Sequence, residues 1–317
     1  MRGHSMKSFL SFMFTFLSFG TVMTTLVWYM LDIKAKTKEA LEECWLKRKD
    51  GTYSKRTNLR VTCNGFDNAI VTQNNTPIGS NIVYSGEKST LQVNKDLFDL
   101  FLKVDHNILI SRLNDVVGIG GTALNWFQCN LPPLENGYEK DVGSKTSLVT
   151  ANPSIIFQKY GALTGRRLPF VESLHKYGNS LLLLPAFSFG RNTAMCQRAA
   201  YTIEDFESPI RPVFSNAQYL HSLDQFWSSE GLKERRLSTG FIMVSMALEL
   251  CENVHLYGFW PFSNHPYDLY TLTNHYYDDV PVKTFFHAMP AEFEHLLQLH
   301  TEGVLRLHLG DCKSDKK

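Results

Sequence analysis

Short apolar runs alternate with amphipathic stretches over the second half of the chain. The runs at residues 147–152, 180–187 and 254–260 are apolar and bounded by turn-forming residues, which is typical of buried strands. The stretches at 222–231 and 240–253 are predicted to be helices. Strands that alternate with helices predict an α/β fold in which helices cover both faces of a sheet.

The longest apolar pattern is an uncharged run at residues 8–31. About 20 apolar residues can span the hydrocarbon core as a helix, and Trp28 and Tyr29 lie near one end, where aromatic side chains gather at the membrane interface. The run lacks the shorter apolar region and the small-residue cleavage site of a signal peptide. We therefore expect a transmembrane signal anchor behind a short tail, residues 1–7. Positive charges flank the anchor on both sides, so these residues alone leave its orientation open.

The residues that follow the predicted anchor divide into two regions. Residues 32–62 are rich in charge and favour a helical stem that holds a domain away from the membrane. Residues 63–317 are predicted to form that domain, because the sequence pattern becomes more ordered from about Cys63. The chain shows no internal repeat or low-complexity tract. A chain of 317 residues is long enough to bury a sizeable core.

Composition excludes one large class of function and leaves others open. The net charge is +1, with 20% charged and 44% hydrophobic residues. A protein that binds nucleic acid by neutralising phosphates carries a clear excess of positive charge. The densest basic run, residues 233–236, is better interpreted as a solvated face.

The cysteines and one sequon indicate an oxidising compartment. Six cysteines lie outside the apolar run and none forms a C-x-x-C pair, which disfavours a zinc or redox motif. An even number of cysteines behind a membrane anchor suits disulfides in a lumenal domain. Asn74 begins the sequence Asn-Asn-Thr and is the candidate glycosylation site.

The start of the predicted helix at 240–253 is a candidate anion site. Ser238, Thr239 and Gly240 precede its apolar residues, and the free N–H groups and positive dipole end of a helix attract anions. Ser and Thr also cap helices with no ligand bound. Both interpretations stay open at this point.

A second candidate site is a cluster of histidines and carboxylates near the C-terminal end. Its members are His275, His287, His295, His300, Asp278, Asp279 and Glu292. A histidine oriented by a carboxylate is a common general base, whereas each histidine alone is more often structural. Metal binding is a weaker alternative, because the chain has neither an H-E-x-x-H nor a D-x-D motif.

Several of these stretches together resemble the sialyltransferases, in particular their α-2,8 branch of ganglioside and oligosialic type. The stretches, in chain order, are CNLPP at 129–133, DVGSKTSLVTANPSI at 141–155, RLSTG at 236–240, LYGFWPF at 256–262, HYYD at 275–278 and the H-x4-E spacing of His287 and Glu292. The strongly basic segment that polysialylating members carry before the short motif is absent.

The resemblance implies a modified Rossmann-like, GT-A-type single catalytic domain behind an N-terminal transmembrane helix. It implies a type II Golgi membrane protein with a cytosolic tail and a lumenal domain. The implied activity moves sialic acid from CMP-sialic acid in α-2,8 linkage to a sialylated glycoprotein or glycolipid, with inversion. The family needs no metal and no other cofactor, and a homodimer is a further expectation. Its motifs imply that the donor nucleotide is contacted by Asn130, Ser238, Thr239 and Gly240, with Trp260 lining the pocket.

Three residues receive catalytic roles from the same resemblance. His275 is expected to hydrogen-bond the CMP phosphate as the glycosidic bond breaks. His287 is expected to act as the general base that takes the proton from the acceptor hydroxyl. Glu292 is expected to support His287 rather than to act on the substrate directly.

The region before CNLPP departs from the family pattern. Asn114 stands where the family has a cysteine and Ile119 where it has a donor-binding asparagine. The resemblance implies that the missing cysteines would pair with Cys251 and Cys312. Residues 103–128 instead resemble a retrotransposon reverse-transcriptase fragment. We therefore expect that a transposon-derived exon, or a faulty gene model, has replaced the first half of the donor loop; a divergent native loop is the alternative. The matching alternative function is a catalytically impaired sialyltransferase-like membrane protein.

Overall fold

The computed structural model describes residues 24, 55, 58–59, 68–102, 126–232, 236–251, 253–265, 270–281 and 289–309. The predicted tail, the anchor except for Thr24, and most of the predicted stem lie outside these residues. Among the helices that are described, none has the length and apolar character needed to cross a bilayer. The predictions for residues 1–7 and 8–31 therefore stay predictions.

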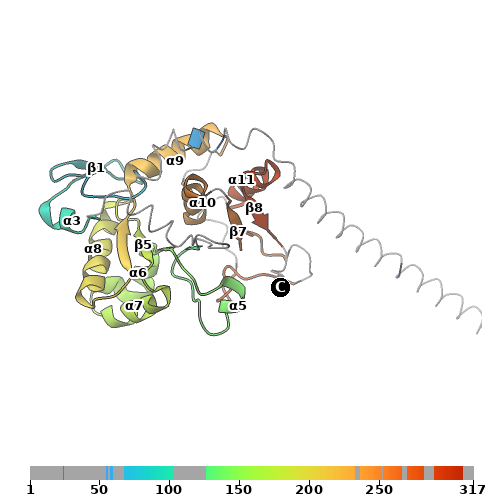
Figure 1. Ribbon diagram of the computed structural model, residues 1–317, viewed down its shortest axis with the longest axis horizontal. Helices are drawn as coiled ribbons and strands as arrows, with labels where there is room; N and C mark the ends of the chain where they lie inside the picture. The colour runs from blue at the N-terminus through green and yellow to red at the C-terminus, as the bar shows by residue number, and fades with distance from the viewer. Residues whose placement is uncertain are drawn as a thin grey trace, which may run out of the picture.

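The largest sheet of the described residues is parallel and has four strands, of which β5 is labelled in Figure 1. Its strands, in spatial order, are β3 (Phe127–Gln128), β4 (Leu148–Thr150), β5 (Leu181–Leu184) and β6 (Arg211–Phe214). β4 and β5 confirm two of the predicted strands, and every residue in them is buried. Near-continuous apolar strands are expected when helices cover both faces of a parallel sheet.

Successive side chains of the central strands enter two separate cores, because strand residues alternate between the two faces. Leu181 and Leu183 of β5 pack with α9 (Ala217–Ser229), α10 (Thr239–Leu250) and α11 (Met289–Thr301). Leu182 and Leu184 pack on the opposite face, with three helices and smaller elements. These helices are α6 (Pro153–Tyr160), α7 (Arg167–Leu174) and α8 (Gly190–Asp205). Figure 1 shows α6, α7 and α8 gathered around β5, while α10 and α11 lie together with β7 and β8. The mixed α/β fold with a parallel sheet is confirmed.

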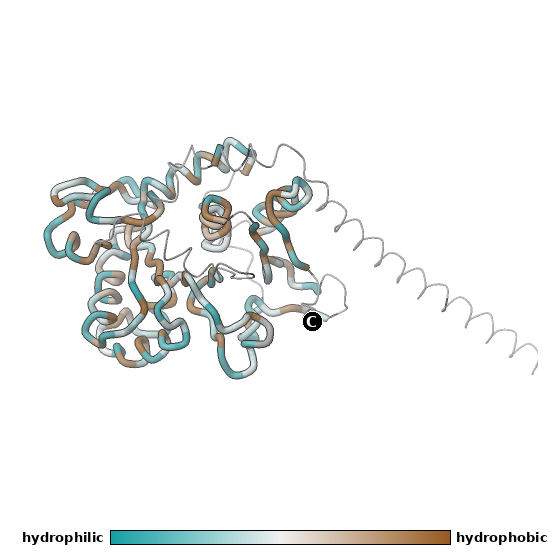
Figure 2. The backbone as a smooth tube through the Cα atoms, in the orientation of Figure 1, coloured by the Kyte–Doolittle hydropathy of each residue, from teal (hydrophilic) through white to brown (hydrophobic). Residues whose placement is uncertain are grey.

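Smaller elements complete the described part of the chain. They are the antiparallel hairpin β1 (Asn81–Val83) and β2 (Thr90–Gln92), the helices α3 (Lys95–Asp99) and α5 (Glu139–Val142), the 3-10 turns Gly161–Leu163 and His175–Tyr177, and the parallel pair β7 (His255–Tyr257) and β8 (Arg306–His308). Figure 2 shows hydrophobic residues concentrated along β5 and α10, whereas the hairpin is largely hydrophilic.

The run at 254–260 does form a strand, but the prediction that it is buried is wrong. In β7 only Leu256 is buried, while His255 and Tyr257 are exposed. The strand pairs with β8 outside the central sheet, and its buried face packs against α10 and α11. Histidine and tyrosine in an otherwise apolar run are amphipathic, which explains why the run resembled a buried strand.

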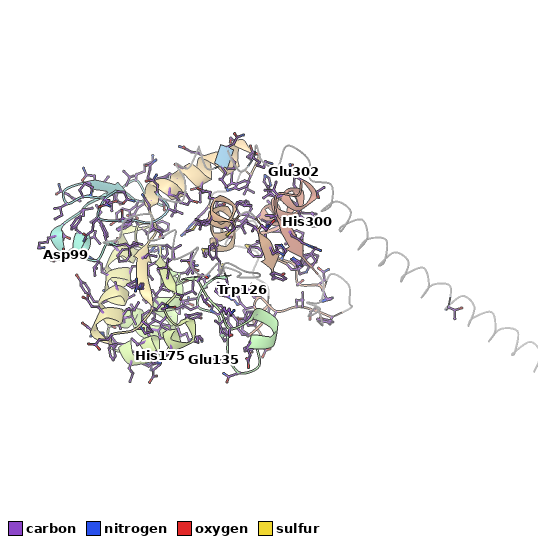
Figure 3. All side chains as sticks on the ribbon, viewed as in Figure 1. Asp99, Trp126, Glu135, His175, His300 and Glu302 are labelled. Carbon is purple, nitrogen blue, oxygen red and sulfur yellow. The ribbon has the colours of Figure 1, made fainter. Side chains whose placement is uncertain are left out.

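Two residues within the predicted stem pack on the domain. Leu59 is 1% exposed and lies in the core that contains α9, α10 and α11. The Nζ atom of Lys55 lies 3.1 Å from a carboxylate oxygen of Glu230 and 3.1 Å from one of Glu302, which follows α11 (Figure 3). The ends of α9 and α11 are thus joined through one lysine.

Cys196 of α8 is fully buried with a free thiol. Its apolar surroundings on the α6–α8 face of the sheet raise the pKa of the thiol to about 12, an effect that the nearby Arg198 charge only partly offsets. The thiol is therefore a packing group at neutral pH.

Candidate active site

The carboxyl ends of the parallel strands meet at one edge, where ligands of α/β proteins bind. Asn130 follows β3 there with a positive φ of 66°, a conformation that asparagine tolerates better than most residues. Its backbone N–H donates to Thr150 Oγ1 at 2.9 Å, and its Oδ1 accepts the backbone N–H of Asn152 at 3.2 Å. Two segments that follow neighbouring strands are therefore locked together.

Asn152 extends this connection to the start of α10. Its Nδ2 lies 3.0 Å from Thr239 Oγ1, and the same hydroxyl lies 3.2 Å from Asn152 Oδ1. Asn130, Asn152 and Thr239 thus form one polar chain across the edge of the sheet. Sequence reasoning did not select Asn152, although its position two residues after a strand matches that of Asn130.

The first residues of α10 form a capped helix start. Ser238 Oγ accepts the N–H of Phe241 at 3.1 Å, so the cap interpretation is confirmed. A side chain on Gly240 would place its Cβ 3.1 Å from Phe259 Cε1, so this glycine allows Phe259 to pack closely. The positive end of the helix dipole and the Asn130–Thr239 chain lie at the same edge, an arrangement that suits an anionic ligand.

Glu292 provides a second anchor for the same helix start. The carboxylate is on α11, is only 3% exposed and accepts the backbone N–H of Ser238 at 2.6 Å. This contact joins two stretches that the sequence analysis treated as separate sites. His287, the residue that Glu292 was expected to support, lies outside the described residues, so that role stays a prediction.

Trp260 is held rigidly after β7. Its Nε1 donates to the carbonyl of Asn264 at 2.7 Å. Its ring meets Phe262 and Phe293 edge-on, with centroids 5.0 Å and 5.3 Å apart. The indole is therefore held in one orientation between the loop after β7 and α11.

The loop at 270–281 carries His275. Nδ1 of His275 lies 2.6 Å from Asp278 Oδ2, and the ring stacks on Tyr277 at a centroid distance of 5.0 Å. The pKa of the Asp278 carboxyl is lowered: the desolvation that would raise it is outweighed by hydrogen bonds from His275 and Val280 and by the charge of His275. The charged carboxylate thus orients the imidazole.

Tyr276 connects this loop to the segment that follows Asn130. Its hydroxyl donates to the carbonyl of Pro133 at 2.5 Å. Its ring also meets that of Tyr138 edge-on at 5.1 Å. The loop of His275 is therefore fastened beside the loop that contains Asn130.

Comparison with known proteins identifies the family of the chain. A model of glycosyltransferase family 29 (sialyltransferase) matches residues 126–304. The chain is 40% identical over 289 residues to human alpha-2,8-sialyltransferase 8F, which covers 86% of the chain and 72% of that protein. It is 42% identical over 272 residues to human alpha-2,8-sialyltransferase 8E, which covers 81% of the chain and 72% of that protein. The chain belongs to glycosyltransferase family 29.

Among solved structures, a mammalian sialyltransferase in complex with Gal-beta-1-3GalNAc-ortho-nitrophenol is similar at 18% identity and a TM-score of 0.34. That similarity covers 58% of this chain and 60% of that one.

The family match begins at Trp126, the residue directly before β3. The carbonyl of Trp126 accepts the N–H groups of Ser147 and Leu148 at 2.9 Å and 3.3 Å. Residues 103–125, with Asn114 and Ile119, lie outside the described residues.

The remaining members of the predicted histidine cluster have structural surroundings. His295 Nε2 lies 3.2 Å from the carbonyl of Glu230. His300 is 3% exposed, and its Nδ1 accepts the N–H of Leu307 at 3.4 Å (Figure 3). For these two residues the structural interpretation holds. Asp279 of the same cluster is exposed in the loop of His275.

Two further predictions concern a metal and a glycan. Within the described residues no group of three or more His, Cys, Asp or Glu side chains could hold a metal ion; metal independence itself stays a prediction. Asn74 is exposed in a turn, and Thr76 of the same sequon donates its hydroxyl to Asn75 Oδ1 at 2.8 Å. Glycosylation of Asn74 stays a prediction.

Proposed function

We propose that the chain transfers sialic acid from CMP-sialic acid, in α-2,8 linkage, to a terminal sialic acid of a glycoprotein or glycolipid. The observation that carries the proposal is identity of 40–42% over most of the chain to proteins named alpha-2,8-sialyltransferases. The polar chain from Asn130 to Thr239 beside the start of α10 supports it, because this is an edge at which a nucleotide can be held.

The reaction is a single displacement. The acceptor hydroxyl attacks the anomeric carbon, the bond to the CMP phosphate breaks on the opposite face, and the configuration inverts. Negative charge grows on the departing phosphate, so donors aimed at it lower the barrier. The helix start at Ser238 and the imidazole of His275, oriented by Asp278, are suited to this task.

The proton of the acceptor hydroxyl goes to a base, for which we propose His287 on the strength of its motif. The proposed contacts to the nucleotide are Asn130, Ser238, Thr239 and Gly240, and Trp260 is proposed to line its pocket. Glu292 holds Ser238 in place, and its proposed support of His287 adds to this contact. Neither a metal nor another cofactor takes part in the proposed reaction.

We further propose a modified Rossmann-like, GT-A-type domain held in the Golgi lumen by the apolar run at 8–31, as a type II membrane protein. The parallel sheet and the family support the fold, and the uncharged run supports the anchor. A homodimer is part of the same proposal.

The test uses the full chain purified in detergent with CMP-sialic acid and an acceptor that ends in sialic acid. Formation of CMP and of a disialylated product of α-2,8 linkage is the expected result, and His287→Ala should lower the rate by about 100-fold or more, as loss of a general base does. Activity that survives His287→Ala contradicts the base assignment. Absence of both turnover and CMP binding in the unaltered chain supports the impaired protein instead.

A further inference from the structure

Two arginines share one aromatic ring beside the candidate donor site. The guanidinium carbons of Arg191 and Arg236 each lie 5.2 Å from the centroid of the Phe189 ring. Arg236 precedes Ser238 by two residues, and Phe189 precedes α8, which follows β5. The group therefore lies at the same carboxyl edge of the sheet as the start of α10.

The ring that carries both arginines is fixed from behind by the β1–β2 hairpin. A Cβ on Gly86 would lie 2.4 Å from Phe189 Cζ, so only a glycine lets the hairpin approach the ring this closely. Gly86 also donates its N–H to the carbonyl of Ser188 at 2.8 Å. Glu87 Oε1 accepts the N–H of Gly190 at 3.0 Å. Phe189 is thus a rigid platform rather than a mobile surface side chain.

Two guanidinium carbons that each lie 5.2 Å from one ring centroid are at most about 10 Å apart, so their like charges repel each other. The pKa of Arg236 is lowered, first by its partial burial and further by the charge of Arg191, while Asp224 opposes the change. The charge of Glu87 offsets part of the positive charge of Arg191, and that of Asp224 offsets part of the positive charge of Arg236. Yet among the described residues, the side chain of Arg191 makes no ion pair or hydrogen bond. A bound anion would relieve the repulsion, and a carboxylate matches the fork of donors that arginine presents.

We propose that Arg191 and Arg236 bind the carboxylate of the acceptor's terminal sialic acid. The inference rests on the proposed function, because an α-2,8 acceptor ends in a sugar that carries a carboxylate. The donor sugar carries one as well. The acceptor is favoured because both arginines reach solvent, Arg236 from a partly buried position, as a site for an incoming glycan must, whereas the Ser238 cap beside them is buried. The two arginines would then select sialylated acceptors over neutral ones.

The test compares an acceptor with its derivative in which the terminal sialic acid is a methyl ester. The full chain in detergent should show kcat/KM about 10- to 100-fold lower on the ester, the range expected when charge-assisted hydrogen bonds to a carboxylate are lost. Arg191→Gln and Arg236→Gln should lower kcat/KM on the free acid by a similar factor and change it little on the ester. The KM for CMP-sialic acid should stay unchanged.

Arg211→Gln is the matched control, because Arg211 is exposed at the amino end of β6, the opposite edge of the sheet. Acid-to-ester ratios in Arg191→Gln and Arg236→Gln that equal those of the unaltered chain would overturn the inference. A raised KM for CMP-sialic acid with unchanged acceptor kinetics would also overturn it, by assigning the pair to the donor carboxylate.

A binding measurement separates this inference from the proposed function. Calorimetric titration of the acceptor and its ester, with CMP present, requires no turnover. If the unaltered chain shows no transfer but binds the acid more tightly than the ester, and Arg191→Gln removes that preference, the proposed function fails while the carboxylate site stands. Equal binding of acid and ester by the unaltered chain would contradict the site.

Discussion

At the scale of single residues, Glu292 is a buried carboxylate that fixes the start of another helix. It is 3% exposed and accepts the N–H of Ser238 at 2.6 Å. A hydrogen bond to a charged group contributes about 1.5–3 kcal/mol. The turn at Ser238, the proposed donor-binding turn, is therefore held by a side chain 54 residues away in the sequence.

We predict that Glu292→Gln raises the KM for CMP-sialic acid by about 5- to 20-fold, because the amide is a weaker acceptor and buries two donors. Steady-state kinetics with varied donor provide the measurement. Glu294→Gln is the control, since Glu294 lies exposed on the same helix and should leave KM unchanged. An unchanged KM in Glu292→Gln would show that the bond does not position Ser238 for the donor.

Tyr276 gives a second prediction at this scale. Tyr276→Phe removes only the hydroxyl that donates to the Pro133 carbonyl. Loss of one such bond corresponds to about 0.5–1.5 kcal/mol, so kcat should fall roughly 2- to 12-fold as the His275 loop loosens. The unfolding temperature should stay within about 2 °C, since the residue is exposed. A variant with full kcat would separate this hydrogen bond from catalysis.

At the scale of elements, the β7–β8 pair joins two histidine rings. His308 Nε2 lies 3.1 Å from His255 Nδ1, and the His308 ring stacks on Tyr257 at 4.3 Å. Burial lowers the pKa of His308 to about 4, with further lowering by His255, Arg306 and His300. Between two neutral rings, one of these nitrogens carries a proton and donates it to the other, whereas protonation of both rings would place two N–H groups against each other.

This pair predicts a pH-dependent stability with a defined sign. In the unfolded chain His308 takes up a proton near its ordinary pKa of about 6.5, whereas in the folded chain it does so only near pH 4. Its contribution is therefore complete above about pH 6.5 and is lost as the pH falls toward 4. Unfolding temperatures measured from pH 7.5 to 4 should fall less steeply in His308→Gln than in the unaltered chain. The same slope in both would refute the assignment; His175→Gln, at an exposed position, is the control.

At the scale of the whole molecule, two residues of the predicted stem pack on the domain. Leu59 is buried with α9, α10 and α11, and Lys55 pairs with Glu230 and Glu302. We predict that Leu59→Ala lowers the free energy of unfolding by about 2–5 kcal/mol, as loss of a buried leucine does. Chemical denaturation would measure this. Asn58→Ala, at an exposed position, should change it by less than about 0.5 kcal/mol. Equal effects would show that Leu59 does not pack on the domain.

Sequence patterns predicted the structural features that depend on residues close together along the chain. The leucines of β5 and the cap at Ser238 follow from local periodicity and side-chain chemistry, and both were confirmed. The family motifs added Asn130 as a candidate and distinguished His275 from the other histidines of its cluster, which local patterns alone could not do. Contacts between distant segments were not predictable: neither the bond from Glu292 to Ser238 nor the exposed face of β7 leaves a local signal. The pairing of Arg191 with Arg236 is of the same kind.

The buried thiol of Cys196 offers a way to measure how often this side of the protein opens. With a pKa of about 12 and no exposed surface, it stays out of reach of alkylating reagents until α8 separates from the sheet. The rate at which a reagent labels Cys196, read by mass spectrometry of its peptide, therefore counts openings of the α6–α8 side. Every variant described above retains Cys196, so the same labelling measurement can be made on each of them without adding a cysteine.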